Sequence, residues 1–225
     1  MAACAVQAQQ GAAHVLDDVV VTATRTAQPL TDVLADVSIV DRETIEQSGA
    51  TGLGDVLARL PGIEMARSGG PGGTTSMFVR GAETRFTAVY VDGVRVDSQA
   101  GSGGTTWEAI PLAQIERIEV LRGPAAAVYG SDAVAGVIQI FTKKGEAGVA
   151  PYVGVGAGSH GTYRAEAGVS GASGAVDYAL GITRETSKGF NAKKDGNPDR
   201  DDYRGTSASG RLGWQLNTAH RLEGN

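Results

Sequence analysis

The apolar and polar positions of the chain follow two different patterns, one before and one after residue 150. In the first part, the apolar residues of 53–60 recur at helical spacing and predict a short helix with one apolar face. Thr51 is placed to cap this helix. Asp41 is placed to cap a preceding helix that runs to about Gln47. The first part therefore begins with two short helices.

Strands predominate in the rest of the first part. The predicted strands cover residues 38–40, 76–80, 86–96, 115–121 and 137–142. Within 86–96, Asp92 and Gly93 lie between alternating apolar residues, which predicts a tight hairpin turn with positive φ angles. Pro124 begins a helical turn that reaches Tyr129. These elements predict a compact α+β unit over residues 38–146.

The second part, residues 150–225, consists of longer stretches of strict alternation. They cover residues 152–158, 162–170, 175–183 and 207–216, and a short one follows at 220–223. We expect an apolar or aromatic face that includes Tyr152, Tyr178 and Trp214. The opposite face is small or charged and includes Arg164, Glu166, Arg184 and Arg211. This pattern is typical of membrane β-hairpins.

The N-terminal residues fit no compact element. Residues 1–15 are either the remnant of a signal peptide, with Val6-Gln7-Ala8 as a cleavage-site pattern, or a disordered tail. Residues 16–37 contain three consecutive valines followed by threonine, which favours a strand without a nearby hairpin partner. Such a segment is either an ordinary short edge strand or one that pairs with the sheet edge of another protein.

Composition excludes several classes of protein. The chain has 225 residues, 33 glycines without a collagen period, 41% hydrophobic residues and a net charge of −5. A nucleic-acid binder would normally show a basic balance, so no nucleic-acid partner is expected. One cysteine and three scattered histidines provide no metal cluster. The G-x-G-x-x-G match at 156–161 precedes an alternating segment instead of a helix, and we find no catalytic constellation. We therefore expect no enzyme.

Several segments, taken in order, resemble the motifs of TonB-dependent outer-membrane receptors. They are a Ton box around Val19–Ala23, D-V-L-x-x-L-P-G at 55–62, V-R-G at 79–81, D-G-V at 92–94, and the stretch from Ile115 to Ala133. The resemblance covers residues 16–142 strongly and 150–217 loosely. Within the family, the chain is most similar to the cobalamin (vitamin B12) receptors.

The resemblance implies a fold, a location and partners. The fold would be an α+β plug domain followed by the first antiparallel strands of a transmembrane β-barrel of about 22 strands. The location would be the outer membrane of a Gram-negative bacterium, in contact with lipid. The partners would be TonB, with ExbB and ExbD, and cobalamin as the imported substrate. A ferric siderophore is the alternative substrate, and a soluble periplasmic binding module is the alternative class of protein.

The resemblance also implies functional residues. The Ton box would be Asp17, Asp18, Val19, Val20, Val21, Thr22 and Ala23. The substrate-binding residues would be Ser68, Thr74, Thr75, Ser76, Glu83, Gly101 and Ser102, where small and hydroxyl side chains allow close approach. Glu83 departs from the amide expected at its position. A structural calcium ion would be held by Asn191, Asn197, Asp199 and Asp201, although a solvated acidic loop explains these residues equally well.

The length of the second part limits what it can build. Only 77 residues follow residue 148 (225 − 148). A barrel of about 22 strands with about 10 residues each would need roughly 220 residues for its strands alone. We therefore expect the sequence to be an N-terminal fragment that contributes four to five strands of the barrel.

Overall fold

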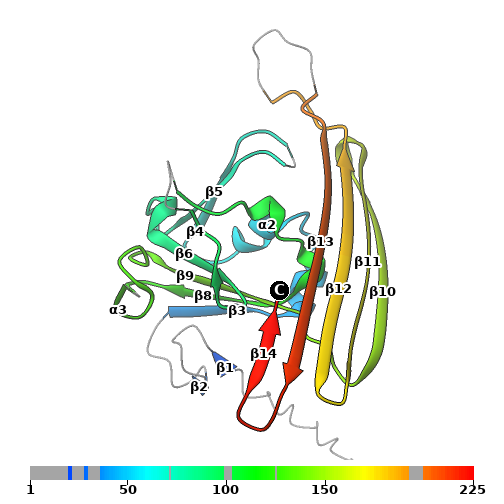
Figure 1. The fold of residues 1–225 in the computed structure, drawn as a ribbon. Coiled ribbons are helices and arrows are strands. Elements are labelled where there is room, and N and C mark those ends of the chain that lie inside the picture. Colours follow the sequence, from blue (N-terminus) through cyan, green and yellow to red (C-terminus); the bar gives the residue numbers. More distant parts are fainter. Residues whose placement is uncertain are drawn as a thin grey trace, which may run out of the picture.

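The computed structural model describes residues 20–21, 28–29, 36–70, 72–98, 103–124, 126–192 and 200–225. Two assemblies make up most of the chain: a globular unit of residues 36–142 and a sheet of long strands that begins at residue 148. In Figure 1, the long strands stand along one side of the globular unit.

A five-stranded mixed sheet forms the centre of the globular unit. Its spatial order is β3 (Asp36–Val40), β8 (Ile115–Arg122), β9 (Gly136–Thr142), β6 (Thr87–Val91) and β7 (Val94–Arg95). Strands β6 and β9 are parallel, and all other neighbours are antiparallel. The predicted hairpin turn is confirmed, because Asp92 and Gly93 have φ angles of 48° and 82° between paired Val91 and Val94.

The two predicted helices are present, with one difference at a cap. Helix α1 (Arg42–Gln47) begins at Asp41, whose Oδ1 accepts the amide of Thr44 at 2.8 Å. Hydrogen bonding from the side chain of Thr44, and then from its amide, lowers the pKa of the Asp41 carboxyl. Helix α2 (Leu53–Leu57) begins after Gly52, so the prediction of Thr51 as its cap is wrong. In the described ranges, no helix has the length and hydropathy needed to cross a membrane.

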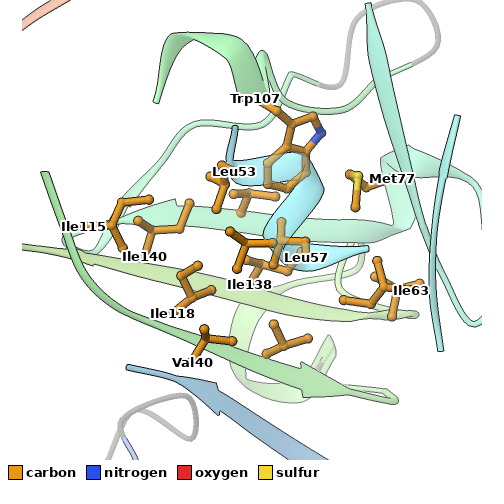
Figure 2. Packing of buried hydrophobic residues seen from close by; sticks show 14 of the residues in the cluster. Val40, Leu53, Leu57, Ile63, Met77, Trp107, Ile115, Ile118, Ile138 and Ile140 are labelled. Atoms are coloured by element: carbon orange, nitrogen blue, oxygen red, sulfur yellow. The ribbon is translucent and has the colours of Figure 1, made fainter. Parts of the chain in front are cut away.

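The main core lies between these helices and one face of the central sheet. Leu57 of α2 is fully buried and lies over Ile138 of β9, while Trp107 covers the cluster from above (Figure 2). Each buried leucine or isoleucine contributes about 2 kcal/mol through the hydrophobic effect. A smaller cluster covers the other face of the sheet and includes Tyr129 of α3 (Ala126–Tyr129). Both faces of the central strands are therefore buried.

A separate hairpin projects from the core of the globular unit. It consists of β4 (Ile63–Arg67) and β5 (Thr75–Val79), paired from Ile63 with Val79 to Arg67 with Thr75. Strand β5 agrees with the predicted strand at 76–80, whereas β4 was not predicted. The connection between the two strands, residues 68–74, is rich in glycine, and we call it the glycine loop.

The long strands form one antiparallel sheet in chain order. They are β10 (Gly148–Gly158), β11 (Thr162–Ser173), β12 (Val176–Ser187), β13 (Tyr203–Gln215) and β14 (Arg221–Gly224). The first four have 11 to 13 residues, enough to span the hydrocarbon core of a bilayer when tilted. They form a single layer, which differs from the sandwich expected of a soluble module.

The two faces of this sheet differ in side-chain size, but two residues, Tyr152 and Arg184, lie on the opposite face from the one predicted. Val153 and Val155 are 82% and 86% exposed on the side away from the globular unit. Tyr152 points the other way, where its ring fills the space beside Gly168 and Gly181. Arg184 is exposed at the end of β12 and donates to Thr206. The absence of side chains at the two glycines makes room for the tyrosine.

The predicted Ton-box segment is paired, which corrects the prediction that it has no hairpin partner. Strand β1 (Val20–Val21) pairs with β2 (Gln28–Pro29), Val20 opposite Pro29 and Val21 opposite Gln28. The remaining five predicted Ton-box residues lie outside the described part of the chain. Because β1 and β2 form a sheet of two strands, the second edge of β1 has no neighbour among the described strands.

A buried ion pair joins the globular unit to the long-strand sheet. Arg211 of β13 donates from Nη1 to Oδ1 of Asp92 at 3.0 Å, and the two side chains are 5% and 4% exposed. Asp92 also accepts the backbone amide of Thr142 at 2.9 Å. Arg211 donates from Nη2 to Glu223 of β14 at 2.7 Å. One carboxylate thus connects the β6–β7 turn, the end of β9 and the fourth long strand.

Breaking this pair should destabilise the chain strongly. We expect Asp92→Asn and Arg211→Leu each to lower the free energy of unfolding by about 3 kcal/mol or more, because Arg211 would keep only the partly exposed Glu223 as a charged partner and Asp92 would keep no charged partner in the long strands. The measurement is urea unfolding of the chain in detergent micelles, followed by tryptophan fluorescence.

Arg204→Leu is the matched control for this prediction. Arg204 lies on the same strand, is 73% exposed and stands 3.5 Å from Asp202. Its loss should cost no more than about 1 kcal/mol. Equal effects of Arg204→Leu and Arg211→Leu would contradict a special role for the buried pair.

Candidate functional site

The glycine loop presents the first group of predicted substrate residues. The amide of Ser68 donates to the carbonyl of Thr74 at 3.0 Å and closes the base of the loop. Ser68 and Thr74 are exposed, Ser76 is half-buried and Thr75 is 6% exposed. Thr75 is therefore the one member of this group whose side chain is enclosed by the globular unit.

A pocket of about 360 Å³ lies between the end of this hairpin and a second loop, and we call it the threonine pocket. Its lining consists mainly of small and hydroxyl residues and contains no basic side chain among the described residues. The lining residues are Gly72, Thr74, Thr75, Ser76, Met77, Thr84, Thr87, Val89, Ser98, Gly103, Gly104, Thr105, Thr106, Trp107 and Glu108. Three of the predicted substrate residues thus share one pocket.

The threonine pocket contains polar groups with unused hydrogen-bonding capacity. Oγ1 of Thr87, Oγ1 of Thr105 and Oε1 of Glu108 are buried without a partner in the described structure. An unpaired buried polar atom costs about 1–3 kcal/mol, so a movement that brings a partner to these atoms would be favourable. Sequence reasoning did not identify these residues, because isolated threonines and glutamates carry no motif.

The other predicted substrate residues lie outside this lining. Glu83 is exposed, and its carboxylate accepts Nε of Arg85 at 2.7 Å. Gly101 and Ser102 are not among the described residues, but Gly103 and Gly104, which follow them, line the pocket. Gly103 has a φ of +70°, and a Cβ there would lie 2.6 Å from Cβ of Arg85. A glycine is therefore needed where this loop passes the Glu83–Arg85 pair.

The connection between β12 and β13 reaches the glycine loop from the long-strand sheet. The ring of Tyr203 occupies the space beside Gly72, so a Cβ at position 72 would lie within its ring atoms. Phe190 lies against Gly70 and contacts His160, with the ring centres 5.0 Å apart and the rings tilted by 46°. In the upper part of Figure 1, the two described ends of this connection lie at the same end of the molecule as the β4–β5 hairpin. The candidate substrate face thus includes both assemblies.

Two of the four predicted calcium ligands lie at the ends of this connection. Asn191 is exposed, and Asp201 accepts the amide of Ala192 at 3.1 Å and has a φ of +44°. Asn197 and Asp199 lie outside the described residues. Within the described ranges, no cluster of three or more acidic, histidine or cysteine residues could hold a metal ion. The calcium site therefore stays a prediction.

Strand β1, from the predicted Ton box, lies at the opposite end of the molecule from these loops. In Figure 1, β1 and β2 lie in the lower part of the view, at the same end as the turn between β13 and β14. Between the two ends, Lys143 connects the globular unit to β10 and places Nζ 4.7 Å from the ring centre of Tyr152. Burial lowers the pKa of Lys143. The molecule thus has a loop-rich end and an end with the β1–β2 pair, separated by the central sheet.

Comparison with known proteins identifies the globular unit. Residues 29–137 match the model of the TonB-dependent receptor plug domain. The chain is 47% identical over 143 residues to the vitamin B12 transporter BtuB of Vibrio vulnificus, which covers 64% of this chain and 23% of that protein. The chain therefore spans about a quarter of the length of this relative.

Solved structures agree with the arrangement of the two assemblies. The ferric enterobactin receptor PfeA of Pseudomonas aeruginosa, in complex with enterobactin, has a TM-score of 0.66 and 27% identity, covering 83% of this chain and 32% of that one. The outer-membrane ferripyoverdine receptor of P. aeruginosa has a TM-score of 0.70 at 23% identity, covering 88% and 25%, and shows the fold alone. Residues 29–137 are therefore a plug domain of the TonB-dependent receptor family, and the chain as a whole resembles these receptors, with an α+β plug followed by long antiparallel strands.

Proposed function

We propose that the chain is part of a receptor that binds cobalamin outside a Gram-negative cell and imports it across the outer membrane. TonB, with ExbB and ExbD, would supply the energy of the proton gradient, and membrane lipid would cover the exposed apolar face of the long strands. The observation that carries this proposal is the 47% identity to a vitamin B12 transporter over a segment of 143 residues.

The chemistry of the threonine pocket is consistent with a cobalamin-like ligand. Cobalamin is a large, rigid corrinoid with amide groups along its rim, which both donate and accept hydrogen bonds. Thr74 and Ser76 offer hydroxyls that can do the same, and Gly103 and Gly104 allow close approach. The buried oxygen of Glu108 would accept an amide N–H.

A ferric siderophore is the second candidate substrate, because structurally similar receptors bind ferric siderophores. An Fe³⁺ complex with three catecholate groups carries net negative charge. Such a ligand would favour basic side chains, and the described lining of the threonine pocket has none. Glu108 adds negative charge to that lining instead. The pocket therefore favours the neutral, amide-bearing ligand.

Binding measurements should separate the two substrates. We expect outer membranes from cells that express the receptor from its natural gene to bind cyanocobalamin, and to bind ferric enterobactin and ferripyoverdine at least about tenfold more weakly. Thr74→Arg should reduce cyanocobalamin binding, because a long charged side chain would enter the pocket.

Ser173→Arg is the control for Thr74→Arg, because Ser173 is exposed at the turn between β11 and β12, away from the loops. Its binding should match that of the wild type. Preferred binding of a ferric siderophore by the wild-type receptor would refute the proposed substrate.

The Ton-box strand is the proposed contact for TonB, because one edge of β1 has no neighbour among the described strands. We expect Val20→Pro to lower cobalamin uptake and leave surface binding intact, since proline removes a backbone donor. Val20→Ile keeps the donor and the β-branched side chain, so it should transport normally. Radiolabelled cyanocobalamin measures both quantities, and unchanged uptake in Val20→Pro would contradict this role.

We also propose that calcium orders the connection between β12 and β13 through Asn191, Asn197, Asp199 and Asp201. The two carboxylates and two amides supply the oxygen ligands that calcium prefers.

Titration calorimetry of the receptor, first treated with EDTA, should show heat of calcium binding in the wild type. Asp201→Asn should reduce that heat or abolish it. Asp202→Asn, at the neighbouring exposed position, is the matched control and should leave it unchanged. The absence of any calcium-dependent heat in the wild type would refute the site.

A further inference from the structure

The β4–β5 hairpin, which carries the candidate substrate residues, is fastened to helix α2 through one arginine. Arg67, the last residue of β4, donates from Nε to Oγ1 of Thr75 at 3.1 Å. Its Nη2 lies 3.0 Å from Oδ1 of Asp55 in α2. The guanidinium of Arg67 therefore links the two strands at the base of the glycine loop to a different element of the plug.

The carboxylate of Asp55 is shared between Arg67 and the beginning of its own helix. Its Oδ2 accepts the hydroxyl of Thr51 at 2.6 Å and the amide of Gly52 at 3.0 Å. The side chains of Asp55 and Arg67 are 20% and 22% exposed, so solvent screens this pair only in part. With one oxygen for Arg67 and one for the helix start, Asp55 holds the arginine in a fixed direction.

Thr75 is fully engaged by the same network. Its hydroxyl donates to the carbonyl of Gly73 at 3.2 Å and accepts Nε of Arg67. Because the side chain is 6% exposed and both roles of the hydroxyl are taken, Thr75 has little to offer a ligand. Its neighbour Thr74 is exposed and available. This arrangement distinguishes a residue that holds the loop from residues that can contact a substrate.

The network continues to the long-strand sheet. Arg164 of β11 donates from Nη1 to the carbonyl of Thr51 at 3.4 Å, and its Nη2 lies 3.0 Å from Glu166. Thr51, Gly52, Arg67, Gly72 and Arg164 line one pocket between the plug and the long strands. The glycine loop is thus linked through the start of α2 to the long-strand sheet.

We propose that Arg67 is a positioning residue for ligand binding, which holds the glycine loop in its binding geometry through Asp55 and Thr75. This inference rests on the proposed function, because it assigns Thr74 and Ser76, rather than Thr75, as the hydroxyls that meet cobalamin. A loop that is already ordered loses less conformational entropy when the ligand binds. Removing the link should therefore weaken binding without removing any contact to the ligand.

The first test measures cyanocobalamin affinity in outer membranes of cells that express the receptor. Arg67→Gln and Asp55→Asn should each weaken binding about tenfold, and the double variant should be no weaker than either single variant, because both break one link. Arg67→Lys, which keeps a charge for Asp55 but loses the planar fork, should be intermediate. Arg59→Gln, an exposed change on the same domain, is the matched control and should bind normally.

The second test does not depend on the ligand. A spin label at Thr74→Cys, with Cys4 changed to serine, reports the mobility of the loop. Mobility should rise in Arg67→Gln and in Asp55→Asn, and should stay at the wild-type level in Arg59→Gln.

The outcomes separate this inference from the proposed function. If wild-type receptor binds no cobalamin but the label becomes mobile in both variants, the proposed substrate is wrong and the positioning role stands. Unchanged mobility in both variants overturns the positioning role. Additive losses of affinity in the double variant would show that Arg67 and Asp55 act separately, which also overturns it.

Discussion

The arrangement of the plug and the long strands depends on the ion pair between the carboxylate of Asp92 and Arg211. Asp92 lies in a two-residue turn with a positive φ, a conformation that aspartate tolerates better than most residues. The same turn directs the carboxylate toward the end of β9 and toward Arg211 of β13. Because both charges are buried, separating the plug from the long strands would remove the partner of a buried charge on each side. Local turn chemistry thus fixes a long-range contact.

The small residues on the inner face of the long strands follow from this contact. The plug has its own hydrophobic core and lies against the inner face of the sheet. Small side chains are therefore favoured on that face over large apolar ones. Gly168 and Gly181 accept the ring of Tyr152, and Gly72 of the plug accepts the ring of Tyr203 from the opposite direction. Glycine therefore serves three purposes here: it allows turns with positive φ, it makes room for a tyrosine on a neighbouring strand of the same sheet, and at Gly72 it allows close approach between the plug and the long strands.

Local signals predicted most of the elements, and long-range contacts explain the errors. The Asp92–Gly93 turn and the Asp41 cap depend on neighbours in sequence, and both predictions are confirmed. Alternation in 115–121 predicts one buried face, yet Glu119 is fully buried because α3 and its neighbours cover the second face of the sheet. Tyr152 was expected on the apolar face because its side chain is aromatic. Its side chain lies on the opposite face from that of Val153, because consecutive residues of a strand alternate between the two faces. The pairing of β1 with β2 joins two segments with six residues between them, and those six residues contain no turn motif that would have predicted the pairing.

The order of strands in the central sheet determines how the proposed pull of TonB on β1 would reach the plug. The chain leads from β1 and β2 into β3, which is an edge strand and pairs only with β8 in that sheet. Side chains also hold β3: Asp36 is 2.7 Å from Arg80, and Ser38 accepts Nη1 of Arg122 at 2.9 Å. An edge strand with five paired residues can separate without disturbing β9 and β6, which lie deeper in the sheet. The Asp92–Arg211 contact lies at the β6–β7 turn, on the far side of these inner strands from β3. A force that removed β3 first would therefore leave the link between the plug and the long strands in place.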